Sequence, residues 1–203
     1  MNTLNEIMEH YDSDKQTAYH GYCKFYEYYF HGLRTQPIAL LEMGIQFGNS
    51  MRGWLEYFRH PDSRFFGIDS GQTPAIADNR YTFFMCDQRH ADTLPLPLLD
   101  IVIDDAGHIA EPMQAAFHHL WPKVKPDGFY VLEDVAVFWD SEYHHSGPAG
   151  QAWLAQLVSD VNQRGKNYHG KPTPNPNAIL TDLEKSIDFV HFMRGLVVIH
   201  KRP

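Results

Sequence analysis

Five side chains that follow two apolar segments have the types needed for metal-assisted proton transfer. They are Asp104, Asp105 and His108 after residues 101–103, and Glu133 and Asp134 after residues 130–132. If the two segments are neighbouring strands, four carboxylates gather at one place and repel one another unless a cation is present. Oxygen ligands without a thiolate select a hard ion, so we expect Mg²⁺, with Mn²⁺ as the alternative. An interpretation without a metal stays open, in which these acids cap helices or pair with lysines.

His108 is the candidate general base of this group. It lies three residues beyond Asp105, within reach of an ion held by that carboxylate. A neutral imidazole accepts a proton near pH 7, and metal coordination lowers the pKa of a bound hydroxyl. The sequence leaves open whether Asp104 or Asp105 is the metal ligand.

Three further segment ends could bind a nucleoside. Gly44 and Gly48 have a GxxxG spacing, which lets the backbone approach a ligand but lacks the GxGxxG pattern of dinucleotide sites. A turn that merely needs positive φ is the alternative. Asp69 could accept the ribose hydroxyls or cap a helix, and Asp87 with Gln88 could bind adenine or lie in a solvated loop.

The elements that must position these residues alternate along the chain from Pro37 onward. Short apolar runs predict strands, amphipathic stretches predict helices, and two late runs around Arg194-Gly195 predict a closing hairpin. The expected strands are 38–43, 64–68, 81–86, 99–103 and 128–132, the expected helices are 50–57, 110–120 and 151–162, and the expected hairpin strands are 187–193 and 196–200. Three prolines in residues 171–177 predict a long loop.

This order predicts an α/β fold of five strand–helix units. We expect a Rossmann-like, doubly wound and mostly parallel sheet with an antiparallel C-terminal hairpin and helices on both faces. Ligands bind such sheets at the carboxyl ends of the strands, where the candidate residues lie. Residues 1–34, polar and rich in aromatic side chains, predict a helical N-terminal cover, and residues 35–203 the main domain.

Composition narrows the class of partner. The chain has 203 residues and a formal net charge of −8, from 17 Lys plus Arg against 25 Asp plus Glu, which disfavours nucleic acid. Cys23 and Cys86 lie in no CxxC or zinc-ligand pattern, so we expect neither a disulfide framework nor a zinc site. The start of the chain lacks the features of a secretory signal, and no run is long enough to span a membrane. We therefore expect a cytoplasmic protein with a small-molecule partner and no membrane partner; a homo-oligomer stays open.

The chain resembles the class I S-adenosylmethionine-dependent methyltransferases, and among them the Mg²⁺-dependent sugar O-methyltransferases of macrolide and related antibiotic biosynthesis. The resemblance covers most of the chain. Its motifs are Ser13-Asp14-Lys15, His20-Gly21-Tyr22, Tyr26-Glu27, Leu41-Glu42-Met43-Gly44, Phe66-Gly67-Ile68-Asp69, Cys86-Asp87-Gln88, Val102-Ile103-Asp104-Asp105-Ala106-Gly107-His108, Tyr130-Val131-Leu132-Glu133-Asp134 and the hairpin runs Val190-His191-Phe192 and Leu196-Val197-Val198-Ile199.

The resemblance implies a role for each motif. Asp105, Glu133 and Asp134 would ligate the metal, and His108 would act as base. The cofactor S-adenosylmethionine would be held by Glu42, Gly44, Gly48, Asp69, Asp87 and Gln88, and Lys15, His20 and Tyr22 would lie in the N-terminal cover at the substrate. Ala106-Gly107 departs from the Gly-Ser usual in the family, but neither usual residue is a ligand. The chain is also short, without the extra N-terminal domain of some relatives, which leaves substrate and oligomeric state open.

The expected function is transfer of a methyl group from S-adenosylmethionine to a hydroxyl of a sugar or similar small-molecule diol. His108 would deprotonate the hydroxyl, and direct displacement at the sulfonium methyl would follow. An NAD-dependent oxidoreductase is one alternative, favoured by the alternating fold and Asp69 but opposed by the GxxxG loop. A relative that resembles the cephalosporin hydroxylases and a non-catalytic binding module are the others.

Overall fold

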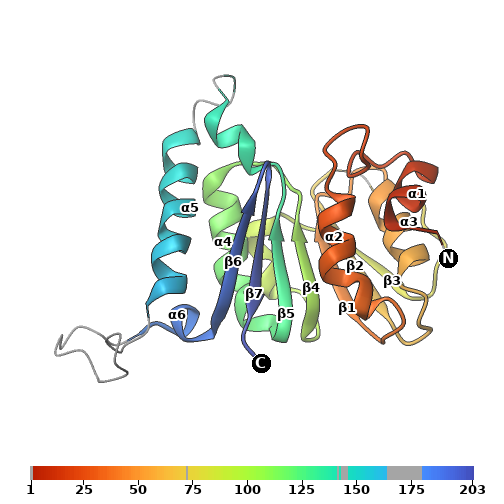
Figure 1. Cartoon of the computed structure of the whole chain (residues 1–203). Helices are drawn as coiled ribbons and strands as arrows, with labels where there is room; N and C mark the ends of the chain where they lie inside the picture. The colour runs from red at the N-terminus through yellow and green to blue at the C-terminus, as the bar shows by residue number, and fades with distance from the viewer. Residues whose placement is uncertain (1, 72, 141, 143–145, 164–179) are drawn as a thin grey trace.

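The molecule is built around one seven-stranded sheet, seen in a computed structural model that describes residues 2–71, 73–140, 142, 146–163 and 180–203 (Figure 1). The strand order is β3-β2-β1-β4-β5-β7-β6. The strands are β1 Ala39–Met43, β2 Arg64–Asp69, β3 Tyr81–Met85, β4 Leu99–Asp104, β5 Val124–Leu132, β6 Ile187–Met193 and β7 Leu196–Lys201. β1 to β5 run parallel, whereas β7 pairs antiparallel with both β5 and β6. The predicted fold class is therefore confirmed.

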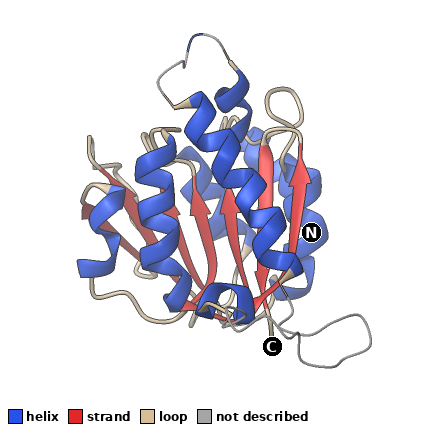
Figure 2. Ribbon diagram, turned by 90° about the vertical axis from the view of Figure 1, so that its left-hand side faces the viewer, coloured by secondary structure: helices blue, strands red, loops and turns tan. Residues whose placement is uncertain are grey.

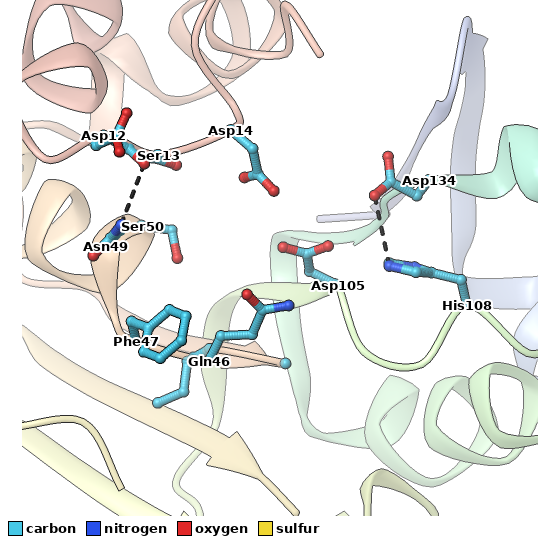
Figure 3. A pocket seen from close by; sticks show the side chains of 12 residues that line it. Asp12, Ser13, Asp14, Gln46, Phe47, Asn49, Ser50, Asp105, His108 and Asp134 are labelled. Carbon is cyan, nitrogen blue, oxygen red and sulfur yellow. Dashed lines mark hydrogen bonds and ion pairs between the residues drawn. The ribbon is translucent and has the colours of Figure 1, made fainter. Parts of the chain in front are cut away.

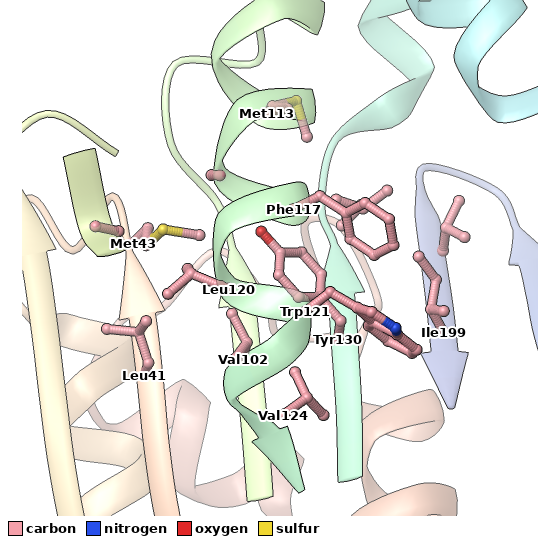
Figure 4. Packing of buried hydrophobic residues seen from close by; sticks show 14 of the residues in the cluster. Leu41, Met43, Val102, Met113, Phe117, Leu120, Trp121, Val124, Tyr130 and Ile199 are labelled. Carbon is pink, nitrogen blue, oxygen red and sulfur yellow. The ribbon is translucent and has the colours of Figure 1, made fainter. Parts of the chain in front are cut away.

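Helices cover both faces of the sheet (Figure 2). They are α1 Leu4–His10, α2 Cys23–Phe30, α3 Asn49–Tyr57, α4 Ala110–Leu120, α5 Gly147–Asn162 and α6 Asp182–Ser186. Each face of the sheet has its own hydrophobic cluster. One cluster lies beneath α1, α2 and α3, and the other lies beneath α4 and α5. In the second cluster Phe117 of α4 packs edge-on against Tyr130 of β5, with ring centroids 5.0 Å apart (Figure 4).

Helix α1 and helix α2 lie in the segment predicted as an N-terminal cover and share a core with the sheet. Helix α1 begins with a capping box between Thr3 and Glu6, which satisfies two backbone donors at its start. The ring of Tyr26 in α2 packs edge-on against Trp54 of α3, with centroids 5.2 Å apart. Because these side chains join the same cluster as strand residues, the boundary at residue 34 stays a prediction.

Three parts of the sequence-based prediction need correction or lie outside the described residues. Strand β5 begins at Val124, not at residue 128, because Leu99 pairs with Val124 across an irregularity before Ile101 pairs with Phe129. The count of five strand–helix units was too high, since the described residues between β2 and β3 contain no helix and β3 is followed by a 3₁₀ helix, Gln88–Thr93. The proline-rich segment 171–177 lies outside the described residues.

The carboxyl ends of β1, β4 and β5 are held at one level by backbone hydrogen bonds that continue past the strands. The Asp105 amide donates to the Met43 carbonyl at 3.0 Å, and the Glu133 amide donates to the Asp104 carbonyl at 2.9 Å. The strand order reverses between β1 and β4, which is where open α/β sheets bind ligands. The sheet therefore brings the predicted acids to its switch point.

Candidate functional site

A polar cavity of about 150 Å³ lies at the carboxyl ends of β4 and β5, and we call it the acid pocket. Asp105, His108 and Asp134 each direct one ligand atom into it, and these atoms lie within 4.8 Å of one another (Figure 3). His108 Nε2 is 3.6 Å from Asp134 Oδ2. The buried Nδ1 atom of His108 has no hydrogen-bond partner among the described residues. These oxygen and nitrogen atoms are close enough together to hold a divalent ion.

The side chains of the two neighbouring acids at the end of β4, Asp104 and Asp105, lie in different environments. Asp104 is fully buried and lies near the Tyr130 hydroxyl and the Gln88 amide, at 3.3 Å from each. Burial raises the pKa of Asp104 to about 8. The Asp105 side chain keeps 14% of its surface exposed and lines the acid pocket. Since successive side chains of a strand alternate in direction, only Asp105 faces the pocket.

Glu133 lies behind the acid pocket, in a buried cluster with residues of the N-terminal cover. Its Oε2 atom is 3.0 Å from the Lys15 Nζ atom, and its Oε1 atom accepts a hydrogen bond from the Tyr26 hydroxyl. The same Lys15 Nζ lies 2.5 Å from Asp105 Oδ2. Burial raises the pKa of Glu133 well above its ordinary value, and the nearby Asp105 adds to the rise, while Lys15 opposes it.

Glu42, at the end of β1, completes this buried cluster and does not line the acid pocket. Its carboxylate accepts hydrogen bonds from the Ser50 hydroxyl at 2.9 Å and the Trp54 indole at 3.3 Å. The Lys15 Nζ atom lies 3.4 Å away. Burial alone would lower the pKa of Lys15, but Asp105, Glu133 and Glu42 outweigh it and raise that pKa well above its ordinary value.

His20 and Tyr22 of the N-terminal segment lie close to Asp134 Oδ1, whereas His108 lies close to Asp134 Oδ2. The Tyr22 hydroxyl donates to Asp134 Oδ1 at 2.6 Å, and His20 Nδ1 lies 3.8 Å from the same oxygen. The two rings stack with centroids 5.3 Å apart. Burial and the Asp134 carboxylate raise the pKa of Tyr22, so its hydroxyl stays protonated and remains a donor. The structure therefore brings His20 and Tyr22 to Asp134, and their contact with a substrate stays a prediction.

A second cavity, of about 500 Å³, adjoins the acid pocket and has the size of a small-molecule site. It is lined by the predicted residues Gly44, Asp69, Asp87 and Gln88, and shares Gly44, Gln46, Asp105 and His108 with the acid pocket. Gly44 has φ +83°, and a Cβ atom there would overlap the backbone carbonyl of Asp105. Glycine thus permits the close approach of the β1 and β4 ends.

The other predicted nucleoside-binding residues differ in how free their side chains are. Asp69 accepts backbone hydrogen bonds from Gln46 at 2.8 Å and from Gly71 at 2.7 Å, which fixes the loops around the cavity. Asp87 pairs with Arg89 at 2.6 Å, and Gln88 is 7% exposed. Gly48, with φ +78°, precedes α3 and lines neither cavity.

Several residues at the site were not assigned from the sequence. Asp12, Ser13, Asp14, Gln46, Phe47 and Asn49 line the acid pocket, and Tyr26 holds Glu133. Most of them lie in the N-terminal segment, which precedes the strands, or in the loop after β1, where only the glycines were assigned from the sequence. Two signals could have pointed to some of them: Ser13, Asp14 and Tyr26 lie within motifs of the resemblance, and Gln46 and Phe47 lie between Gly44 and Gly48.

Known proteins resemble the chain over nearly all of its length. It is 31% identical over 98% of its residues to 8-demethyl-8-(2-methoxy-alpha-L-rhamnosyl)-tetracenomycin-C 3'-O-methyltransferase of Streptomyces olivaceus, and it covers 53% of that protein. It is 30% identical, again over 98%, to mycinamicin VI 2''-O-methyltransferase of Micromonospora griseorubida and covers 52% of it. The chain is a homologue of sugar O-methyltransferases. It thus spans about half the length of these curated relatives, and no family model matches it.

The homology agrees with the fold. The MycE methyltransferase of the mycinamycin pathway, solved with Mg and SAH, superposes with a TM-score of 0.85 over 99% of this chain and 55% of its own, at 23% identity. A caffeoyl-CoA O-methyltransferase homologue of Staphylococcus aureus gives a TM-score of 0.60 over 88% of this chain and 81% of its own, at 13% identity. The architecture is the Rossmann-like fold of the class I methyltransferases. None of the described helices is long and apolar enough to cross a membrane.

Proposed function

We propose that this chain transfers a methyl group from S-adenosylmethionine to a hydroxyl of a sugar or similar small-molecule diol, with the help of Mg²⁺ or Mn²⁺. The observation that carries this proposal is the meeting of the two cavities at Asp105 and His108. A methyl donor in the larger cavity and a hydroxyl in the acid pocket would approach each other beside a base. The homology to O-methyltransferases supports methyl transfer over the NAD-dependent alternative.

The larger cavity would hold S-adenosylmethionine. Gly44 would let the backbone come close to the methionine part, Asp69 would accept hydrogen bonds from the ribose hydroxyls, and Asp87 with Gln88 would contact the adenine; all four line the cavity. Glu42 would act indirectly, since its buried carboxylate accepts hydrogen bonds from Ser50 and Trp54 of α3. Gly48 would act through the turn into the same helix. MycE, whose fold matches, was solved with SAH, the demethylated product of this donor.

The acid pocket would hold the divalent ion, and its donor set fits one. Asp105 and Asp134 provide carboxylate oxygens on the pocket side. Glu133 does not line the pocket but shares Lys15 with Asp105, and it would be the third ligand. Hard oxygen donors suit Mg²⁺ or Mn²⁺ and leave positions for a substrate hydroxyl. When bound, the ion would lower the pKa of that hydroxyl. MycE was solved with Mg.

His108 would take the proton. Its imidazole lines both cavities, and Asp134, 3.6 Å from Nε2, would orient the ring. The acceptor oxygen then forms a bond to the methyl carbon as the carbon–sulfur bond breaks, so S-adenosylhomocysteine and a methyl ether leave while His108 holds the proton. His20 and Tyr22 would keep Asp134 in place and close the acceptor side.

The acceptor we propose is a glycosylated small metabolite. The curated relatives are named for methylation of rhamnosyl tetracenomycin and of mycinamicin VI, which supports a sugar hydroxyl. We propose a cytoplasmic location and no nucleic-acid or membrane partner. We also propose that the protein forms a homo-oligomer. The chain covers only 53% of the first of these relatives. The acceptor, the location and the assembly are therefore proposals.

The test is a methyl-transfer assay with S-adenosylmethionine and a set of rhamnosylated and macrolide acceptors, followed by mass spectrometry. The expected result is a mass gain of one methylene on a sugar, lost with EDTA and restored by Mg²⁺. Full activity in EDTA would remove the metal from the proposal. Oxidation of an acceptor with NAD and no methylation by S-adenosylmethionine would replace it by the oxidoreductase alternative.

A further inference from the structure

Lys15 is a fully buried cation at the centre of the candidate site. Its side chain has no exposed surface and does not line the acid pocket, so in this arrangement it does not touch an acceptor. Instead the ammonium contacts carboxylates from the ends of three adjacent strands, namely Glu42 after β1, Asp105 after β4 and Glu133 after β5. Burying an unpaired charge is costly, and the three carboxylates offset that cost for the Lys15 ammonium. Lys15 therefore has a structural role in this cluster.

Two residues of the N-terminal segment fix the orientation of the candidate ligands. Lys15 Nζ lies 2.5 Å from Asp105 Oδ2 and 3.0 Å from Glu133 Oε2, and it therefore joins the two carboxylates. The Tyr26 hydroxyl donates to the other oxygen of Glu133. Tyr26 is itself fully buried and packs against Trp54, so its hydroxyl has little freedom to move.

We infer that Lys15 and Tyr26 are positioning residues that hold Asp105 and Glu133 in the geometry required for a divalent ion. The inference rests on the proposed function. Groups that hydrogen-bond metal ligands set the orientation of those ligands, and losing one typically costs 10- to 100-fold in metal affinity. Lys15 and Tyr26 of the N-terminal segment would thereby support the metal site without being ligands themselves.

Simple electrostatics predicts the opposite result for Lys15. An ammonium this close to the candidate ligands repels a divalent ion, so its removal without any loss of geometry would tighten metal binding. Positioning predicts weaker binding. Tyr26→Phe tests the loss of ligand orientation without a change in charge repulsion, because it removes one hydrogen bond to Glu133 and leaves every formal charge unchanged.

The experiment measures the dissociation constant of Mn²⁺ by electron paramagnetic resonance for the wild type, Lys15→Met and Tyr26→Phe. Two matched controls lie outside the site. Lys125→Met removes a lysine that pairs with Asp100 at 2.8 Å, and Tyr57→Phe removes a buried tyrosine whose hydroxyl donates to Glu27 at 3.1 Å. Thermal melting confirms that each variant is folded.

We expect Mn²⁺ affinity to fall by about 10- to 100-fold in Lys15→Met and in Tyr26→Phe, and to stay at the wild-type value in both controls. Unchanged or tighter binding in a folded Lys15→Met would overturn the inference. If Lys15→Met does not fold, Tyr26→Phe decides, and wild-type affinity there overturns it equally. A wild type that binds S-adenosylhomocysteine but no Mn²⁺ would overturn both this inference and the metal of the proposed function; equal Mn²⁺ affinity in all proteins would overturn the inference alone.

Discussion

Gly44→Ala should damage both stability and cofactor binding through a single methyl group. Gly44 has φ +83°, and a left-handed conformation costs a residue with a side chain about 1–2 kcal/mol. The added Cβ would also overlap the Asp105 carbonyl and crowd the Ala106 Cα atom, which are backbone atoms and cannot turn aside. We therefore expect the free energy of unfolding to fall by at least about 2 kcal/mol.

The same methyl group should push Asp105 away from the wall that the two cavities share. We expect affinity for S-adenosylhomocysteine, measured by calorimetry, to fall about tenfold, which corresponds to about 1.4 kcal/mol. Gly32→Ala is the matched control, because a Cβ there meets nothing within 4 Å and no positive φ is involved; its stability and affinity should stay near those of the wild type. Urea denaturation that shows equal stability for Gly44→Ala and the wild type would refute the close approach of β1 and β4.

Three other predictions address the chemistry of the site. His108→Ala should lower kcat by about 10²- to 10⁴-fold with little change in the affinity for S-adenosylhomocysteine, and equal losses in both would make His108 structural. Asp105→Asn should abolish the stimulation by Mg²⁺ in a methyl-transfer assay; stimulation equal to that of the wild type would exclude Asp105 as a ligand. Burial raises the pKa of Asp104 to about 8 from an ordinary value of 3.8, so folding favours the protonated carboxyl and the wild type should lose stability as the pH rises through this interval. Asp104→Asn should reduce this slope in urea denaturation between pH 5 and 8, with the remainder due to the other buried acids such as Glu133, and an unaltered slope would show that Asp104 ionises without cost.

The strands that carry the site could be predicted from the sequence because each is a short apolar run that ends in an acid or a glycine. β1, β2, β4 and the C-terminal hairpin lie within a residue of the expected positions. β5 was predicted too short because its first half contains Lys125, Pro126 and Asp127, and this part is polar. Apolar periodicity does not detect a strand segment that lies exposed at the end of a sheet.

The arrangement of the acids was harder to predict, because it depends on contacts between segments distant in sequence. The choice between Asp104 and Asp105 depends on which face of β4 is buried, and only the packing of Tyr130 and Gln88 against Asp104 decides it. Similarly, nothing local distinguishes a lysine that binds substrate from one that neutralises buried carboxylates. Lys15 contacts Glu133 across 118 positions of sequence, and such a contact is visible only in the folded chain.

Calorimetry on the wild-type chain tests the central claim most directly, with S-adenosylhomocysteine titrated in the presence and absence of Mg²⁺ and Mg²⁺ titrated separately. We expect saturable binding of the nucleoside product at one site, and a separate heat of Mg²⁺ binding that disappears in Asp105→Asn. Binding of NADH without any binding of S-adenosylhomocysteine would contradict a methyl-donor site in the larger cavity.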